Sequence, residues 1–171
     1  DFVQCLTLEE LHTMWAPESE GEIKRWNQVR SSWPDERLQL YGPGVDSGTF
    51  DYFTETVNGE AQSSRGDFTS SERDNVLVVG IAGDRGSLGY FGYSYFVENQ
   101  DILKMVAIDS GNGCVFPTDE TINNGTYAPL SRPLFIYVSK ESWAEQDVKN
   151  FVSYYMSYER AGLLRDLGFV P

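Results

Sequence analysis

The segment Gly42 to Thr49, which reads GPGVDSGT, has the residue types of an anion-binding loop. Its small residues leave backbone N–H groups accessible, and Ser47 and Thr49 add two hydroxyl groups. If a helix begins here, its first N–H groups have no partner inside the helix, and the helix dipole places partial positive charge there. These donors would all point at one small oxyanion. Such binding needs neither a nucleophile nor a base, so we predict no catalytic residue. The same letters are also typical of an ordinary turn followed by a helix N-cap.

The elements on either side of the loop would position it for binding. Residues 37–41 alternate between polar and apolar side chains, which predicts a half-buried strand over Leu38 to Tyr41. After the loop, Phe50, Phe53 and Val57 recur at the spacing of one buried helix face. The loop therefore follows the carboxyl end of a strand, where ligands bind in open α/β sheets.

The rest of the chain also alternates between helix and strand patterns. The other predicted helices cover residues 8–15, 70–83, 93–99, a short stretch from 118, and 144–158 followed by a turn with Leu163, Leu164 and Leu167. The other predicted strands cover 88–91, 103–108 and 134–138, of which Leu134 to Val138 has the strongest strand composition. A polar loop over 58–70 carries Arg65. The pattern predicts an α/β fold with a mixed central sheet flanked by helices.

Composition limits the kinds of partner. The 171 residues include 26 acidic and 13 basic side chains, a net charge of −13, which repels nucleic acid and anionic membranes. We therefore predict no nucleic-acid partner. An anion can still bind locally, because charge-assisted hydrogen bonds contribute about 1.5–3 kcal/mol each, whereas dispersed surface charges are screened within about 8–10 Å.

The cysteines and the single histidine do not indicate a metal site or a Cys-x-x-Cys redox centre. Cys5 and Cys114 are too far apart for a Cys-x-x-Cys motif, and they form either one disulfide, which we favour for an exported protein, or two buried thiols. His12 lies inside a helical pattern and is interpreted as a surface residue. No metal site and no cofactor are predicted.

Taken in order, several segments resemble the PstS-type phosphate-binding proteins of bacterial ABC phosphate uptake systems. The segments are 1–11 (DFVQCLTLEEL), 40–53 (LYGPGVDSGTFDYF), 63–68 (SSRGDF) with 74–82 (DNVLVVGIA), 88–93 (LGYFGY) and 129–134 (PLSRPL). Their joint order covers nearly the whole chain and is more specific than any one motif.

The resemblance implies two α/β lobes of the periplasmic-binding-protein type II kind, joined by a hinge, with phosphate in the cleft between them. This chain is similar to the second lobe, residues 1–113, plus a hinge return and C-terminal segment, residues 114–171, that would normally complete the first lobe. We therefore expect a fragment that lacks the first lobe. The targeting segment is also expected to lie outside this sequence, because its first residues do not form a signal peptide.

The resemblance further implies that Ser47, Gly48 and Thr49 bind phosphate oxygens. Many family members carry an arginine four residues before this serine, where the present chain has Pro43. Arg65 is the predicted substitute, since a planar guanidinium suits bidentate contact with phosphate. Asp46 is interpreted as a helix cap or an arginine partner, rather than as the carboxylate that accepts a proton from phosphate.

The predicted function is therefore that of an extracytoplasmic phosphate receptor, periplasmic or at the cell surface, that is not an enzyme. Its partners would be inorganic phosphate, ABC permease subunits and the first lobe, with self-association or strand exchange through an uncovered C-terminal segment. Arg132 is interpreted as a structural ion-pair partner at the hinge. The alternatives are a receptor for another tetrahedral oxyanion and a phosphate-ester hydrolase with Ser47 or Asp46 as nucleophile.

Overall fold

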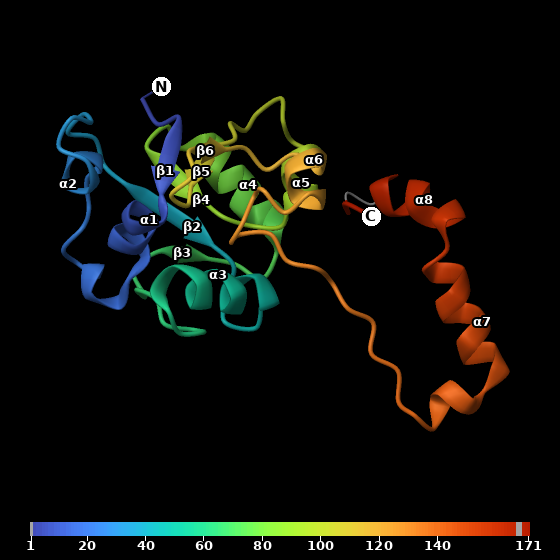
Figure 1. The fold of residues 1–171 in the computed structure, drawn as a ribbon. Helices are drawn as coiled ribbons and strands as arrows, with labels where there is room; N and C mark the ends of the chain where they lie inside the picture. Colours follow the sequence, from blue (N-terminus) through green and yellow to red (C-terminus); the bar gives the residue numbers. More distant parts are fainter. Residues whose placement is uncertain (1, 167–168) are drawn as a thin grey trace.

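Strands and helices alternate in the computed structural model, which describes residues 2–166 and 169–171 (Figure 1). The strands are β1 (Cys5–Thr7), β2 (Gln39–Gly42), β3 (Thr69–Ser70), β4 (Ser87–Gly89), β5 (Ala107–Asp109) and β6 (Cys114–Val115). They form two three-stranded sheets, in the orders β1-β5-β6 and β3-β2-β4. The second sheet is parallel throughout, whereas β5 pairs in parallel with β1 and antiparallel with β6. The predicted α/β class, with helices beside a mixed sheet, is confirmed.

Most helices follow the predicted positions closely, and one short helix, over Trp26–Val29, forms where none was predicted. They are α1 (Leu8–Trp15), α2 (Trp26–Val29), α3 (Gly48–Asn58), α4 (Asp74–Gly83), α5 (Tyr93–Val97), α6 (Asp119–Asn123), α7 (Gln146–Tyr155) and α8 (Ala161–Asp166), with 3-10 turns η1 (Pro17–Ser19), η2 (Ser142–Ala144) and η3 (Tyr158–Arg160). Helix α1 begins with a capping box between Thr7 and Glu10. Helix α4 starts four residues later than predicted. Of the predicted final turn, Leu163 and Leu164 lie in α8, and Leu167 lies outside the described residues.

Helix α3 is held against the core by its apolar face and by α1. Phe50, Phe53 and Val57 are all buried, as their spacing predicted. The Trp15 ring packs edge-on against Phe53 at 5.5 Å and against Tyr90 at 4.9 Å. This packing fixes the helix whose first turn follows the glycine-rich loop.

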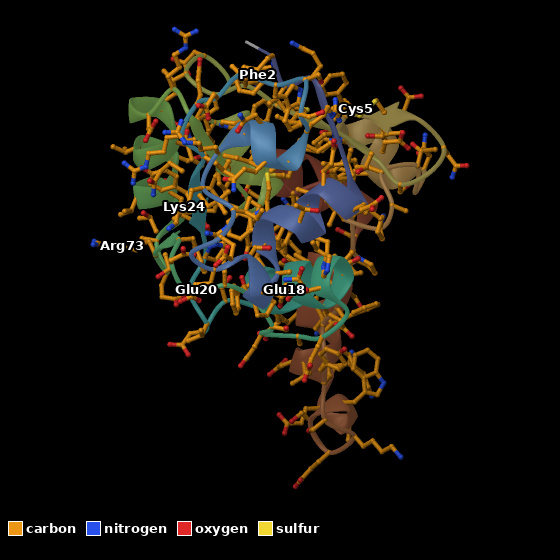
Figure 2. All side chains as sticks on the ribbon, turned by 90° about the vertical axis from the view of Figure 1, so that its left-hand side faces the viewer. Phe2, Cys5, Glu18, Glu20, Lys24 and Arg73 are labelled. Atoms are coloured by element: carbon orange, nitrogen blue, oxygen red, sulfur yellow. A yellow bond between two sulfur atoms is a disulfide. The ribbon has the colours of Figure 1, made fainter. Side chains whose placement is uncertain are left out.

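A disulfide links β1 to β6, the two outer strands of the first sheet. Cys5 and Cys114 are bonded, with their Cα atoms 5.9 Å apart, and Cys5 is labelled in Figure 2. The disulfide interpretation is therefore confirmed, and the alternative of two buried thiols is wrong.

The segment after Arg132 leaves the body of the molecule as an extended arm that carries η2, α7 and α8 (Figure 1). The predicted strand over Leu134 to Val138 is wrong, because these residues form no strand and most are exposed, Leu134 to 70% and Tyr137 to 88%. An extended segment becomes a strand only when a neighbouring strand pairs with its backbone. Within the described residues, no strand pairs with this segment. The predicted strand over 103–108 is likewise reduced to Ala107–Asp109.

No helix in the described part of the chain is both long enough and apolar enough to span a bilayer.

Candidate functional site

The first turn of α3 presents backbone donors without protein partners. Ser47 is the N-cap, and its Oγ accepts a hydrogen bond of 3.2 Å from the N–H of Thr49. The first helical bond runs from the N–H of Asp51 to the carbonyl of Ser47. Among the described residues, the N–H groups of Gly48 and Phe50 have no acceptor. The N-cap interpretation and the anion-site interpretation are therefore compatible, because capping uses only one of the donors.

The glycine-rich loop is shaped by close packing on both sides. A Cβ atom on Gly42 would lie 2.9 Å from Cε1 of Tyr90, and a Cβ on Gly44 would fall on the Glu72 carboxylate. The N–H of Ser47 donates to the carbonyl of Gly44 at 3.1 Å, which closes the turn before the helix. The glycines thus allow the loop to run tightly from the end of β2 into α3.

Asp46 does not take the predicted role of a cap, which belongs to Ser47. Its side chain is exposed, and its backbone N–H donates to Oε1 of Glu72 at 3.4 Å. Burial and the neighbouring Glu72 raise the pKa of Asp74 at the start of α4. In the first turn of α3, Oδ1 of Asp51 is buried without a hydrogen-bond partner among the described residues.

Arg65 is buried in the fold rather than placed at the start of α3. Its guanidinium forms a two-pronged ion pair with Asp67 and donates through Nη1 to the carbonyls of Met14 and Ile23, both at 3.0 Å. The side chain is only 4% exposed. This pairing also lowers the pKa of Asp67 to about 2, chiefly through the Arg65 hydrogen bond.

The position of Arg65 relative to α3 follows from a hydrogen-bond acceptor that it shares with Asn58. The carbonyl of Trp15 accepts hydrogen bonds from the Arg65 N–H and from Nδ2 of Asn58, the last residue of α3. The helix has 11 residues, and a rise of 1.5 Å per residue separates its two ends by about 15 Å. The structure therefore brings Ser47, Gly48 and Thr49 together but does not bring Arg65 to them.

A different arginine lies at the start of α3. Nη2 of Arg132 donates to the carbonyl of Gly48 at 2.8 Å, and the guanidinium lies over the Tyr52 ring, 4.9 Å from its centre. The Tyr52 hydroxyl in turn donates to the carbonyls of Pro129 and Ser131. Within the described residues, Arg132 forms no ion pair with a carboxylate. The predicted ion pair of Arg132 is therefore wrong.

A large groove of about 1440 Å³ opens beside this end of α3. Thr49, Tyr52, Ser131 and Arg132 line one part of it, and apolar side chains of α5, the arm and the C-terminal residues line much of the rest. The helix start is therefore reached from a groove bordered by the arm.

The single histidine lies far from Ser47 along α3. The ring of His12 lies near the opposite end of α3, where Nδ1 is 3.2 Å from the carbonyl of Val57 and 3.1 Å from Oδ1 of Asn58. Within the described part of the chain, no group of three histidine, cysteine or acidic side chains is arranged to hold a metal ion.

Comparison with known proteins identifies the relatives of this chain. Residues 19–159 match the model of the PBP superfamily domain. Protein SphX of Synechocystis is 44% identical over 172 residues, which cover 100% of this chain and 51% of that protein. The phosphate-binding protein PstS of Staphylococcus haemolyticus is 35% identical over 175 residues, which cover 99% of this chain and 52% of that protein.

A solved structure shows the same fold. The crystal structure of "a possible phosphate binding protein" from Planctomyces limnophilus has a TM-score of 0.83 and 46% sequence identity, and the match covers 97% of this chain and 58% of that one. The present chain spans about half the length of the curated relatives it matches.

Proposed function

The chain belongs to the PBP superfamily, and on this basis we propose that it binds inorganic phosphate as part of an extracytoplasmic receptor of an ABC phosphate importer. The observation that carries the proposal is the pair of unpartnered N–H groups, those of Gly48 and Phe50, at the first turn of α3. With the hydroxyls of Ser47 and Thr49 they form a set of donors suited to a tetrahedral anion. The name of the Staphylococcus relative, a phosphate-binding protein, supports phosphate as that anion.

The receptor would work by reversible capture between two lobes rather than by chemistry. Residues 1–113 would form the phosphate-binding lobe, and 114–171 the hinge return and the segment that completes the other lobe. Because β6 joins β5 in one sheet, the chain would leave the body only beyond this boundary. Closure of the lobes around the anion would present the loaded receptor to the permease.

The arm supports the existence of a further packing partner. Phe135, Tyr137, Phe151 and Met156 are each at least 65% exposed. Exposed apolar surface of this extent seldom persists in a monomer. The first lobe would cover it, and without that lobe the arm would drive self-association or strand exchange between copies.

Phosphate titration of the 15N-labelled 171-residue chain tests the binding proposal. We expect inorganic phosphate to shift the amide signals of Gly48 and Phe50 with a Kd of about 1 mM or tighter, and sulfate at equal ionic strength to act more weakly. Thr49→Val, which removes one hydroxyl, should weaken binding severalfold, whereas Thr56→Val on the same helix should not. Unchanged signals at the helix start, or equal responses to both anions, would contradict the proposal.

The hydrolase alternative predicts a different result. If Ser47 were a nucleophile, Ser47→Ala would abolish release of phosphate from a simple phosphate monoester. Under our proposal the wild-type chain releases none, and Ser47→Ala merely weakens phosphate binding. Turnover by the wild type that is lost in the variant would favour the enzyme.

Sedimentation of the chain tests whether the arm drives self-association. We expect dimers or larger species that dissociate on dilution, and a smaller association constant for the double variant Phe135→Ser, Tyr137→Ser. A strict monomer at high protein concentration would show that the arm's apolar surface does not drive association.

A further inference from the structure

We propose that Arg132 supplies the guanidinium that contacts the bound phosphate, a role that rests on the proposed phosphate-binding function. Arg132 lies 84 positions after Gly48 in the sequence, yet its Nη2 is 2.8 Å from the Gly48 carbonyl. A Cβ atom on Gly48 would stand 3.2 Å from the same nitrogen. The guanidinium is therefore in direct contact with the residue whose N–H is unpartnered.

Most of the donors of Arg132 remain available. A guanidinium has five N–H donors in a fixed fork. Within the described residues, the contact to Gly48 is the hydrogen bond that Arg132 makes, and its side chain is exposed. Arg65, by contrast, uses Nε, Nη1 and Nη2 in bonds to Asp67 and two carbonyls. Of these two arginines, Arg132 is the one that combines proximity to the helix start with donors that no described residue uses.

Arg132 lies beside the start of a helix and has no carboxylate partner among the described residues. A cation beside the first turn of a helix faces the positive end of the dipole, where negative groups are normally favoured. No carboxylate of the described residues forms an ion pair with Arg132. A phosphate between the guanidinium and the N–H groups of Gly48 and Phe50 would be attracted to both and would offset their mutual repulsion.

The side chain is also held in place. The guanidinium lies over the Tyr52 ring, and Tyr52, one turn into α3, is fastened by its hydroxyl to the carbonyls of Pro129 and Ser131. The helix that offers the amides thus also positions the segment that carries Arg132. This arrangement reduces the ordering cost of bringing the charge to the ligand.

The test compares phosphate affinity of the full 171-residue chain and its variants. Arg132→Gln should raise the Kd for inorganic phosphate about tenfold or more, and Arg132→Lys, which keeps the charge but not the fork, should fall between that variant and the wild type. Arg37→Gln, at another exposed arginine, should change the Kd less than about twofold. The urea midpoint of each variant shows whether the fold is intact.

A direct signal separates contact from a structural role. Phosphate should shift the side-chain 15N signals of Arg132 but leave those of Arg65 unchanged. Wild-type binding that Arg132→Gln leaves unaltered, or a phosphate response at Arg65 instead, would overturn this inference alone. Absence of any phosphate binding by the wild-type chain would overturn the proposed function itself, and the assignment of Arg132 with it.

Discussion

Replacing Arg65 with methionine should destabilise the fold while leaving the start of α3 intact. The substitution keeps a long side chain but removes the ion pair to Asp67 and the donors to the carbonyls of Met14 and Ile23. These contacts tie the loop after α3 to the end of α1 and to the segment that follows it. The variant therefore separates a structural arginine from a ligand-binding one.

The expected loss follows from the burial of the two partners. Removing one member of a buried pair costs about 3–5 kcal/mol. Arg65 is 4% exposed but Asp67 is 35% exposed, so water can partly hydrate the remaining carboxylate and reduce the cost to about 2–4 kcal/mol. With a urea dependence of about 2 kcal/mol per molar, the midpoint of unfolding should fall by about 1–2 M.

Urea unfolding followed by tryptophan fluorescence measures the loss, and phosphate titration below the transition measures binding. Asp67→Asn and the double variant complete a double-mutant cycle that isolates the pair. We expect a favourable coupling energy and a phosphate Kd within about twofold of the wild type. A variant of Arg65 that keeps its urea midpoint but loses phosphate binding would refute the structural role and restore Arg65 as a ligand.

Three other perturbations have expected outcomes. Reducing the disulfide between Cys5 and Cys114, which are 109 residues apart, should lower the free energy of unfolding by about 5 kcal/mol on the loop-entropy model. The double Cys→Ser variant should be as stable as the reduced protein, and adding reductant should not change its stability. The pKa of Asp67 falls from 3.8 to about 2 on folding. Its contribution to the free energy of unfolding is therefore complete above about pH 4 and is lost as the pH falls toward 2. Acid unfolding of Asp67→Asn checks this, because the variant should lack this pH-dependent contribution. Gly83→Ala, in open space, should raise the thermal midpoint slightly, whereas Gly80→Ala, against a tyrosine ring, should lower it; a reversed order would contradict this packing.

The local elements could be predicted because their signals are local. The helix predicted over residues 8–15 forms as α1, and the capping box between Thr7 and Glu10 marks its start. The spacing of Phe50, Phe53 and Val57 placed the buried face of α3. Each of these patterns depends on residues within three or four positions of one another, so the chain needs no distant partner to express them.

The strand predicted over Leu134 to Val138 failed for the opposite reason. Its apolar, β-branched and aromatic residues have strand propensity, but a strand forms only when another strand pairs with its backbone. That partner is not among the described residues, and the segment extends away from the body. Propensity describes what a segment can form and does not supply its neighbour.

The sequence by itself determined that a short loop of small residues would end one strand and start a helix, whose first N–H groups have no partner inside the helix. Only the tertiary structure decided which arginine accompanies them. Arg65 is nearer in sequence, but the packing of α1 and α3 holds it at the far end of the helix. Arg132 reaches Gly48 because the chain folds back across 84 positions. Sequence distance sets helix and turn chemistry, whereas the meeting of two charged groups depends on how the chain packs as a whole.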